Sequence, residues 1–406
     1  MEKLDEKYID LILKRCVNFE QSKSLMIHCD FKEHVAFAEK MKLRAHEMGI
    51  MDVCIHVNDM DEIHDYLSQT DVSDIELNPI IDRTAWNDYA LKGGALVFLN
   101  STVPGLMNDI SAEKIKKWAD EREKTIKYYR NNVSSYKFPW CIAALPNERW
   151  AKTIFGDVDD AYLKLYFSIM QMCMIDRDDP VLAWEEYINN NNYYKNTLNE
   201  MGIKNLHYTN SLGTDLYVGL PEGCQWINLD KNDINGGQMI ANMPSYEIFT
   251  CPDRNRTNGI VYSSRPLFYN DCCIDGFNLE FEDGKVVSCS AKVGQEMLEK
   301  LIFENNNTQY LGEVALVPCD SPISNTGIVF NETLFDENAS CHLAIGRGFP
   351  RCFQDYENLT QEELMQIGMN FSDVHVDFMI GTPDLMIEAE TEKGKVLIFK
   401  DGNFNI

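Results

Sequence analysis

The chain has 406 residues, of which 45% are hydrophobic and 25% are charged, and its formal net charge is -27. This balance is typical of a soluble globular protein, and the length favours two domains over a single core. An acidic surface argues against nucleic acid as a partner, because phosphate binding needs clustered Lys and Arg. No run of about 18 apolar residues is present, so no membrane span is expected.

The N-terminal segment and the cysteines favour a cytoplasmic protein. Residues 1–21 mix charges of both signs and lack the apolar stretch of a signal peptide, so secretion is not expected. The 13 cysteines include no C-x-x-C pair, so a four-cysteine zinc site has no local support. We therefore expect reduced thiols that serve as small apolar residues.

The first half of the chain alternates predicted strands and helices. Apolar runs predict strands at 24–30, 51–59, 94–100 and 140–146, and helical spacing predicts helices at 31–48, 60–69, 111–135, 159–175 and 180–202. This alternation indicates parallel βαβ units in an open α/β sheet. No Gly-rich phosphate loop follows any of these strands, so a dinucleotide site is not supported.

The pattern changes near residue 205, where closely spaced strand signals begin. The turn 'EDGK' at 282–285 predicts a hairpin, a helix is expected at about 291–304, and a final hairpin occupies 385–402. We therefore expect an α/β protein of two parts. An N-terminal open α/β sheet domain, serving as scaffold or gate, would cover 1–200, and a strand-rich α+β catalytic domain would cover 201–406.

His375 and Asp377, in 'VHVDFMIG', form a distinct signal in the second half. On a strand, residues at i and i+2 point to the same face. A carboxylate among Val, Phe, Met and Ile is costly unless it is paired or bound to a metal. The alternative is a satisfied core histidine beside a surface aspartate, which is a common chance combination.

Glu313 lies inside the apolar segment 'LGEVALVP'. With ordinary alternation it would share one strand face with Leu311, Ala315 and Val317, and it would be the polar member of that face. Because both faces of this strand are apolar, the pattern favours a buried, compensated carboxylate over an outward-facing one.

Glu247 and the segment 'FDENASCHLAIG' add further candidates. Taken alone, Glu247 has the features of an ordinary surface glutamate. The segment is predicted to be a loop that runs into a helix, capped by Asp336 or Asn338. Glu337 and His342 are five residues apart, which is not a helical ligand spacing, so Glu337 would come from the loop and His342 from the helix. His342 would be either a ligand or a core imidazole.

Taken together, these imidazoles and carboxylates form a coherent set of metal ligands. Imidazole suits zinc, cobalt or iron, and a carboxylate can bridge two ions. Two ions about 3.5–4 Å apart polarise a carbonyl group and lower the pKa of water. The combination predicts a metal-dependent hydrolase.

The same segments, in this order, resemble the thermophilic-type metalloaminopeptidases, the family of aminopeptidase T, aminopeptidase S and PepS. The resemblance extends over the whole chain and is densest between 242 and 383, above all in 'LGEVALVP' and 'DENASCHLAIG'. It implies a homodimeric exopeptidase with two divalent metal ions, often zinc or cobalt. Its substrates would be peptides with a free N-terminus, from which it would remove N-terminal amino acids with broad specificity.

The resemblance also implies roles for particular residues. Carried over position by position, the metal-binding set would be Glu247, Glu313, Glu337, His342, His375 and Asp377. Glu313 would be a shared ligand near the nucleophilic water and a catalytic proton acceptor. The family pattern has a tyrosine whose hydroxyl assists the transition state, where this chain has Phe349. Arg347 and Tyr246 are candidates to compensate.

We therefore expect a metalloaminopeptidase in which acidic groups near the ions hold the α-amine of the substrate. Two alternatives remain. Phe349 motivates the first, a metal-binding relative with weak or no peptidase activity that acts as a peptide-binding protein. The second is a different metal-dependent amidohydrolase, which would not require a free N-terminus.

Overall fold

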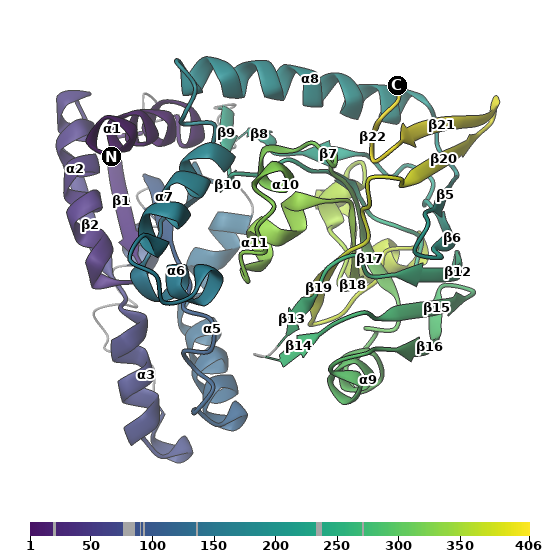
Figure 1. Cartoon of the computed structure of the whole chain (residues 1–406), viewed down its shortest axis with the longest axis horizontal. Coiled ribbons are helices and arrows are strands. Elements are labelled where there is room, and N and C mark those ends of the chain that lie inside the picture. The colour runs from purple at the N-terminus through teal and green to yellow at the C-terminus, as the bar shows by residue number, and fades with distance from the viewer. Residues whose placement is uncertain are drawn as a thin grey trace. The chain divides into compact units, whose positions relative to one another are not determined.

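The structure is a computed structural model that describes residues 1–18, 22–75, 86–89, 91, 94–134, 137–232, 238–269 and 272–406. The chain divides into two compact units (Figure 1). The first comprises Met1–Glu185 with Asp230–Pro244, and the second comprises Glu186–Leu229 with Ser245–Ile406.

A parallel sheet forms the centre of the first unit. Its strand order is β10-β4-β3-β1-β2, and its strands are β1 (Ser24–Cys29), β2 (Asp52–Val57), β3 (Ala95–Asn100), β4 (Trp140–Ala144) and β10 (Asn242–Met243). All six residues of the central strand β1 are buried, as expected for a parallel strand covered on both faces. The predicted open α/β sheet is therefore confirmed.

Helices alternate with these strands along the chain, as the sequence predicts. They are α1 (Glu2–Leu11), α2 (Val35–Glu47), α3 (Met60–Gln69), α5 (Ala112–Ser134), α6 (Glu148–Phe155) and α7 (Ala161–Met172). Short helical turns lie at Ile12–Cys16, Lys32–His34 and Val72–Asp74, and the short strands β8 (Asp230–Asn232) and β9 (Gln238–Ile240) pair with each other.

The two units divide inside helix α8 (Pro180–Glu200), whereas the sequence pattern places a boundary near residue 200. The segment 230–244 returns to the first unit because β10 pairs with β4, with Asn242 opposite Ile142 and Met243 opposite Ala143. A strand of two residues leaves no periodic signal in a sequence.

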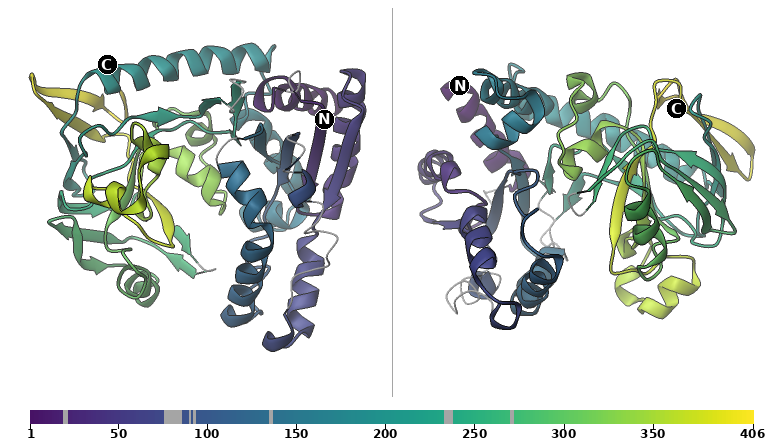
Figure 2. Two further views of the ribbon diagram at one scale, coloured as in Figure 1. Left: turned by 180° about the vertical axis from the view of Figure 1, so that it is seen from behind. Right: turned by 60° about the horizontal axis from the view of Figure 1, so that its bottom comes forward.

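Helices α3 and α5 lie side by side in Figures 1 and 2. They pack through an apolar cluster that includes Ile63 and Leu67 of α3, and Lys114 at the start of α5 donates a hydrogen bond to the Leu67 carbonyl.

Helix α5 is 23 residues long, but it is rich in charged residues. Among the helices that the structure describes, none combines the length and the hydrophobicity that crossing a membrane requires.

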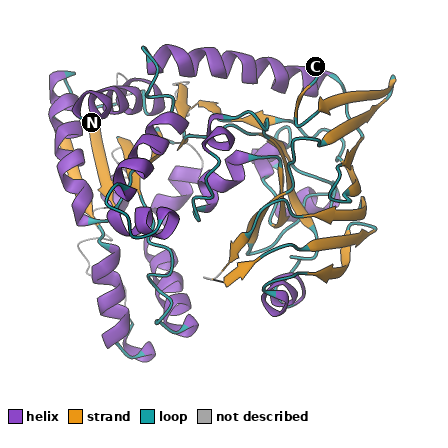
Figure 3. Cartoon of the chain, viewed as in Figure 1, coloured by secondary structure: helices purple, strands orange, loops and turns teal. Residues whose placement is uncertain are grey.

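The second unit is rich in strands, as predicted for the sequence after residue 205 (Figure 3). One antiparallel sheet has five strands in the order β19-β18-β17-β11-β7, and another has eight in the order β16-β15-β12-β6-β5-β20-β21-β22. Strands β13 and β14 form a separate two-stranded antiparallel sheet. The turns predicted at 282–285 and within 385–402 both join paired strands, β15 to β16 and β20 to β21.

The five-stranded sheet consists of β7 (Ile227–Asn228), β11 (Ile248–Thr250), β17 (Leu311–Leu316), β18 (His342–Gly346) and β19 (His375–Met379). The other strands are β5 (Asn205–Thr209), β6 (Asp215–Gly219), β12 (Thr257–Tyr262), β13 (Leu267–Tyr269), β14 (Cys272–Ile274), β15 (Asn278–Glu282), β16 (Lys285–Ser290), β20 (Met386–Thr391), β21 (Gly394–Lys400) and β22 (Asn403–Phe404). The helices are α9 (Gln295–Phe303), α10 (Pro322–Thr326), α11 (Thr333–Asp336) and α12 (Gln361–Gln366), with short turns at Glu337–Ala339, Pro350–Cys352 and Tyr356–Asn358.

A single apolar cluster takes side chains from both antiparallel sheets. Val314, Leu343 and Phe378 form one row across β17, β18 and β19, and they pack in the same cluster as Leu216 and Ile387 of the eight-stranded sheet. Because successive strand residues point to opposite faces, the neighbours of these residues in sequence face away from this core.

A β-bulge at Gly312 decides which residues of β17 face the core. The register between β17 and β18 shifts between Leu311 and Glu313, so Leu311 packs in the same cluster as Val314. The prediction that Leu311 shares the face of Glu313 is wrong, because the extra residue reverses the alternation. Glycine suits this position, since a Cβ on Gly312 would lie 2.4 Å from the carbonyl oxygen of Arg347.

The segment 335–346 forms a helical turn followed by a strand, so the predicted helix after the loop is wrong. His342 begins β18, and all five residues of this strand are buried. The strand lies between β17 and β19 and is paired with both of them. Tertiary hydrogen bonding therefore decides the conformation of a short apolar run whose periodicity is ambiguous.

The role of Phe378 in the core can be tested by truncation. Its side chain is 2% exposed, so Phe378→Ala is expected to lower the free energy of unfolding by about 3–5 kcal/mol. Urea denaturation measures this change. Phe268→Ala is the matched control, because Phe268 is 40% exposed, and it is expected to cost less than about 1 kcal/mol. Equal costs for the two variants would contradict the packing described.

Candidate metal centre

The outer face of the five-stranded sheet collects acidic and imidazole side chains. Glu313, Ala344 and Asp377 form one row across β17, β18 and β19. His342 lies two residues before Ala344, and His375 lies two residues before Asp377, so all four polar side chains share this face. Ala344 contributes a methyl group between the two carboxylates.

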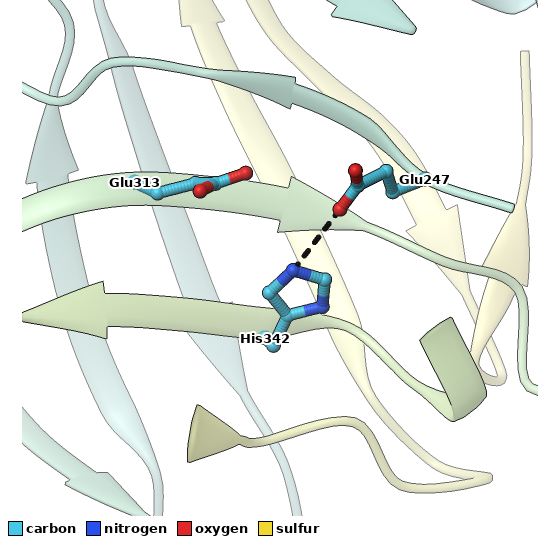
Figure 4. A group of neighbouring side chains, drawn as sticks. All are labelled: Glu247, Glu313 and His342. Atoms are coloured by element: carbon cyan, nitrogen blue, oxygen red, sulfur yellow. Dashed lines mark ion pairs between the residues drawn. The ribbon is translucent and has the colours of Figure 1, made fainter. Parts of the chain in front are cut away.

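Glu247 reaches the same face from the position directly before β11. Strand β11 pairs with β17, with Phe249 opposite Ala315. Glu247 precedes Phe249 by two residues and therefore points to the same side. Figure 4 shows the carboxylates of Glu247 and Glu313 and the ring of His342 directed toward one another.

Three ion pairs connect these side chains. His342 Nε2 lies 3.3 Å from Glu247 Oε2, and His375 Nε2 lies 3.2 Å from Glu313 Oε2 and 3.3 Å from Asp377 Oδ1. Water reaches this region poorly, since the side chains of His342 and Glu313 are 1% and 4% exposed.

The five residues form two groups of three that share Glu313. One group is Glu247, Glu313 and His342, and the other is Glu313, His375 and Asp377. In each group, one potential ligand atom from every residue lies within 4.8 Å of the others. The structure thus brings together residues that are up to 130 positions apart in the sequence, from Glu247 to Asp377.

Backbone carbonyl groups fix the orientation of both imidazoles. His375 Nδ1 lies 2.6 Å from the carbonyl oxygen of Arg347, and His342 Nδ1 lies 3.2 Å from that of Ser340. A carbonyl oxygen only accepts, so Nδ1 carries the proton and donates it in both rings. Nε2 of each ring is therefore directed at the carboxylates, which is the arrangement found for histidines that bind metals.

Glu337 approaches the set from the short helical turn before β18. Burial raises the pKa of Glu337 well above its usual value, and the negative charges of Asp377, Glu247 and Glu313 raise it further. Glu337 also forms a hydrogen bond that lowers the pKa of Asp377. The structure therefore places Glu337 beside Asp377, although it belongs to neither group of three.

Burial and neighbouring charges shift the pKa values of Glu313 and His342. Burial raises the pKa of Glu313 to about 7, although the hydrogen bond with His375 opposes this. For His342, burial favours the neutral ring, but the ion pair with Glu247 and the charge of Asp377 outweigh it and raise the pKa to about 9. Without bound cations, the cluster therefore retains protons at neutral pH.

These residues fit divalent cations on three grounds. Four carboxylates and two neutral imidazoles carry a charge that two divalent ions would balance, and burial makes an unbalanced charge costly. Both imidazoles present Nε2 to the carboxylates. Asp377 Oδ1 is buried and makes no hydrogen bond to any residue that the structure describes, although it has an ion-pair contact with His375.

An aromatic cluster borders the acidic set. The ring of Phe349 lies 4.8 Å from that of His375 and 5.5 Å from that of Phe249, measured between centroids. The guanidinium of Arg351 lies 5.2 Å from the Phe349 ring and 5.3 Å from the Phe249 ring, within the range of cation–π interactions. The ring of Phe349, at the position of the tyrosine in the family pattern, therefore packs directly against the candidate ligand His375.

The two residues predicted to compensate for Phe349 have different surroundings. Arg347 is exposed, and it contacts the site through its carbonyl oxygen, which accepts from His375. Tyr246 is fully buried, and its backbone N–H donates to Asn338 Oδ1 at 2.7 Å. This places Tyr246 beside the ligand set, directly before Glu247.

Sequence reasoning missed the residues that support the set. Asn338 was predicted to cap a helix, and it binds the backbone of Tyr246 instead. Asp336 caps no helix either, since its carboxylate accepts hydrogen bonds from the backbone N–H groups of Phe330 and Glu332. The polar residues next to Glu337 are a signal for such a supporting role, but the sequence does not reveal that Asn338 binds Tyr246, which lies 92 positions away.

The whole chain is similar to known metallopeptidases. A family model described as thermophilic metalloprotease (M29) matches residues 1–404. Aminopeptidase 2 of Geobacillus stearothermophilus is 34% identical over 406 residues, which cover 99% of this chain and 98% of that protein. Aminopeptidase PepS of Streptococcus thermophilus is 33% identical over 405 residues, with 99% and 98% covered.

The fold agrees with this relationship. The solved structure of wild-type AmpT from Thermus thermophilus matches with a TM-score of 0.90 at 27% sequence identity, and the match covers 100% of this chain and 99% of that one. The predicted resemblance is confirmed, because a family model and curated relatives both match over nearly the full length. The chain belongs to the M29 family of thermophilic metalloproteases.

Proposed function

We propose that this chain is a metal-dependent aminopeptidase that hydrolyses N-terminal amino acids from peptides by means of a water molecule activated by two divalent ions. The observation that carries this proposal is the pair of three-residue groups that share Glu313. The relatives named aminopeptidases, which match over nearly the full length, support the same activity.

The two groups suggest how the ligands divide. Glu247 and His342 would hold one ion, His375 and Asp377 would hold the other, and Glu313 would bind both. Glu337, which lies beside Asp377, would complete the second set. Mixed imidazole and carboxylate ligands suit zinc or cobalt.

The residues of the chain have distinct roles in this proposal. Divalent ions bound here would supply a Lewis acid for the scissile carbonyl and a hydroxide nucleophile at neutral pH. Glu313 is placed between the two groups, where its carboxylate would accept a proton from the attacking water and return it to the leaving amine. Phe349 and Phe249 border this face and would exclude bulk water from it.

Carboxylate oxygens of the set that are not bound to an ion would accept hydrogen bonds from the positively charged α-amine of a peptide. The cluster is rich in acid, since Glu247, Glu313, Glu337 and Asp377 face only His342 and His375 as possible cations within it. This charge explains why a free N-terminus would be required.

Phe349 supports a second candidate function, a peptide-binding relative with weak or no peptidase activity. The Phe349 ring packs against His375, but it lacks the hydroxyl that the family pattern provides for the transition state. The homodimer, the cytoplasmic location and the scaffold or gate role of the first unit stay predictions that rest on the resemblance and on composition.

The role of Glu313 can be tested by removing its charge. Glu313→Gln is expected to lower kcat/KM for amino-acid anilides by at least about 100-fold, because it removes both the shared ligand and the proton acceptor. Removing metal with a chelator should abolish the activity, and restoring zinc or cobalt should recover it. Glu296→Gln is the matched control, since that side chain is 84% exposed and lies on α9.

Two outcomes of these assays would contradict the proposal. Full activity of Glu313→Gln, or a purified protein that binds no divalent metal, would exclude the mechanism. Turnover of N-acetylated anilides at an undiminished rate would instead favour a different amidohydrolase, because acetylation removes the positive charge of the α-amine.

Ion binding should release protons and strengthen with rising pH. In the ion-free cluster the pKa is raised to about 7 for Glu313 and about 9 for His342, and both groups must be deprotonated to bind metal. The apparent affinity should therefore fall as the pH falls from about 9 to below 7. Calorimetric titration in two buffers of different ionisation enthalpy measures the released protons. An affinity independent of pH over this range would contradict the description of the cluster.

Phe349→Tyr separates the two candidate functions. If the wild type is an efficient aminopeptidase, this substitution should change kcat by less than about tenfold, and the alternative is excluded. A gain of about 100-fold or more from an inert wild type would favour the peptide-binding relative, because one oxyanion donor contributes about that much. Steady-state kinetics at saturating metal measure the difference.

A further inference from the structure

The backbone of Tyr246, the residue before Glu247, is held at both its N–H and its carbonyl by side chains, of which Asn338 is buried and Tyr187 is half-buried. The N–H of Tyr246 donates to Asn338 Oδ1 at 2.7 Å, and the carbonyl of Tyr246 accepts from the Tyr187 hydroxyl at 2.9 Å. The rings of Tyr187 and Tyr246 also pack edge to face, with centroids 5.0 Å apart. The backbone that leads into Glu247 is therefore fixed by two side chains from distant parts of the second unit.

Both of these side chains are themselves held in place. Asn338 is fully buried, and its Nδ2 donates to the Leu334 carbonyl at 2.9 Å. On the other side, Asn191 Nδ2 donates to the Tyr187 oxygen at 3.4 Å, and Asn228 Nδ2 donates to Asn191 Oδ1 at 2.5 Å. This chain of contacts gives a role to the asparagine-rich run at 188–196, which the proposed function leaves unexplained.

Glu247 needs such support more than the ligands that lie within strands do. Glu313, His342 and Asp377 lie within β17, β18 and β19, where strand pairing fixes their backbone. Glu247 lies outside β11, which begins at Ile248, so no strand pairing holds its own residue. Its carboxylate nevertheless reaches to within 3.3 Å of His342 Nε2.

We propose that Tyr187 and Asn338 are positioning residues, which fix Glu247 for the ion that it shares with Glu313 and His342. The inference rests on the proposed function, because it takes Glu247 to be a ligand. It predicts a selective effect: loss of the Tyr187 hydroxyl weakens the ion of this group and leaves the ion of His375 and Asp377 unchanged. Partners that orient ligands contribute about 10–100-fold to metal affinity.

The test is a titration of the ion-free Tyr187→Phe variant with cobalt. Calorimetry and the visible absorption of the bound cobalt measure the affinity for each ion. We expect one of two ions to bind about 10–100-fold more weakly than in the wild type, while the other binds with unchanged affinity. Tyr208→Phe is the control, because Tyr208 is a buried tyrosine of the second unit whose hydroxyl makes no hydrogen bond to any described residue. The control should bind both ions as the wild type does.

A double-variant cycle shows whether Tyr187 acts through Glu247. Glu247→Gln identifies which ion belongs to this group. Adding Tyr187→Phe to Glu247→Gln should then cause no further loss of affinity, whereas independent effects would add. Asn338→Ala should weaken the same ion as Tyr187→Phe, and it gives a second, separate test of the inference.

The outcomes distinguish this inference from the proposed function. If the wild type binds two ions and Tyr187→Phe binds both with unchanged affinity, or both with equally reduced affinity, the positioning role is overturned and the proposed function stands. If the wild type binds no cobalt, the proposed function fails and the inference fails with it. A selective loss that disappears in the Glu247→Gln background supports the inference.

Discussion

Acidic side chains that share one buried sheet face need positive charge nearby, and this requirement governs the second unit. Glu313 and Asp377 lie in one row across β17, β18 and β19 with the methyl group of Ala344 between them, and Glu247 and Glu337 approach from just before β11 and from the turn before β18. Burying several carboxylates without cations costs several kcal/mol per charge, so such a set persists only where something compensates it. The two histidines offer part of that compensation, and divalent ions would offer the rest.

The packing of the five-stranded sheet holds these acidic side chains on one face. The inner face of the same strands packs Val314, Leu343 and Phe378 into a core shared with the eight-stranded sheet, so the strands cannot rotate to expose their acids. The bulge at Gly312 shifts the alternation of side chains along β17, so that Leu311 faces the core while Glu313 stays on the outer face. Among the five residues of the two groups of three, Glu247 is the exception, since its position depends on side-chain contacts to the Tyr246 backbone rather than on strand pairing.

Much of the fold and of the candidate site could be predicted from the sequence. The features that could not be predicted depend on contacts between distant parts of the chain. His375 and Asp377 were predictable because strand spacing places them on one face within an apolar run. The conformation of His342 was not predictable, because the short segment 'HLAIG' fits a helix or a buried strand, and the pairing of β18 with two neighbours decides between them. The bulge at Gly312 and the support of Glu247 depend on partners far away in sequence, which periodicity does not reveal.

Anomalous X-ray scattering from crystals of the cobalt-loaded protein would show whether Glu313 lies between two ions. Two anomalous peaks are expected on the outer face of the five-stranded sheet. One peak would contact Glu247 and His342, the other would contact His375 and Asp377, and both would contact Glu313. A single peak at this face, or two peaks that do not share Glu313, would exclude a role for Glu313 as the shared ligand.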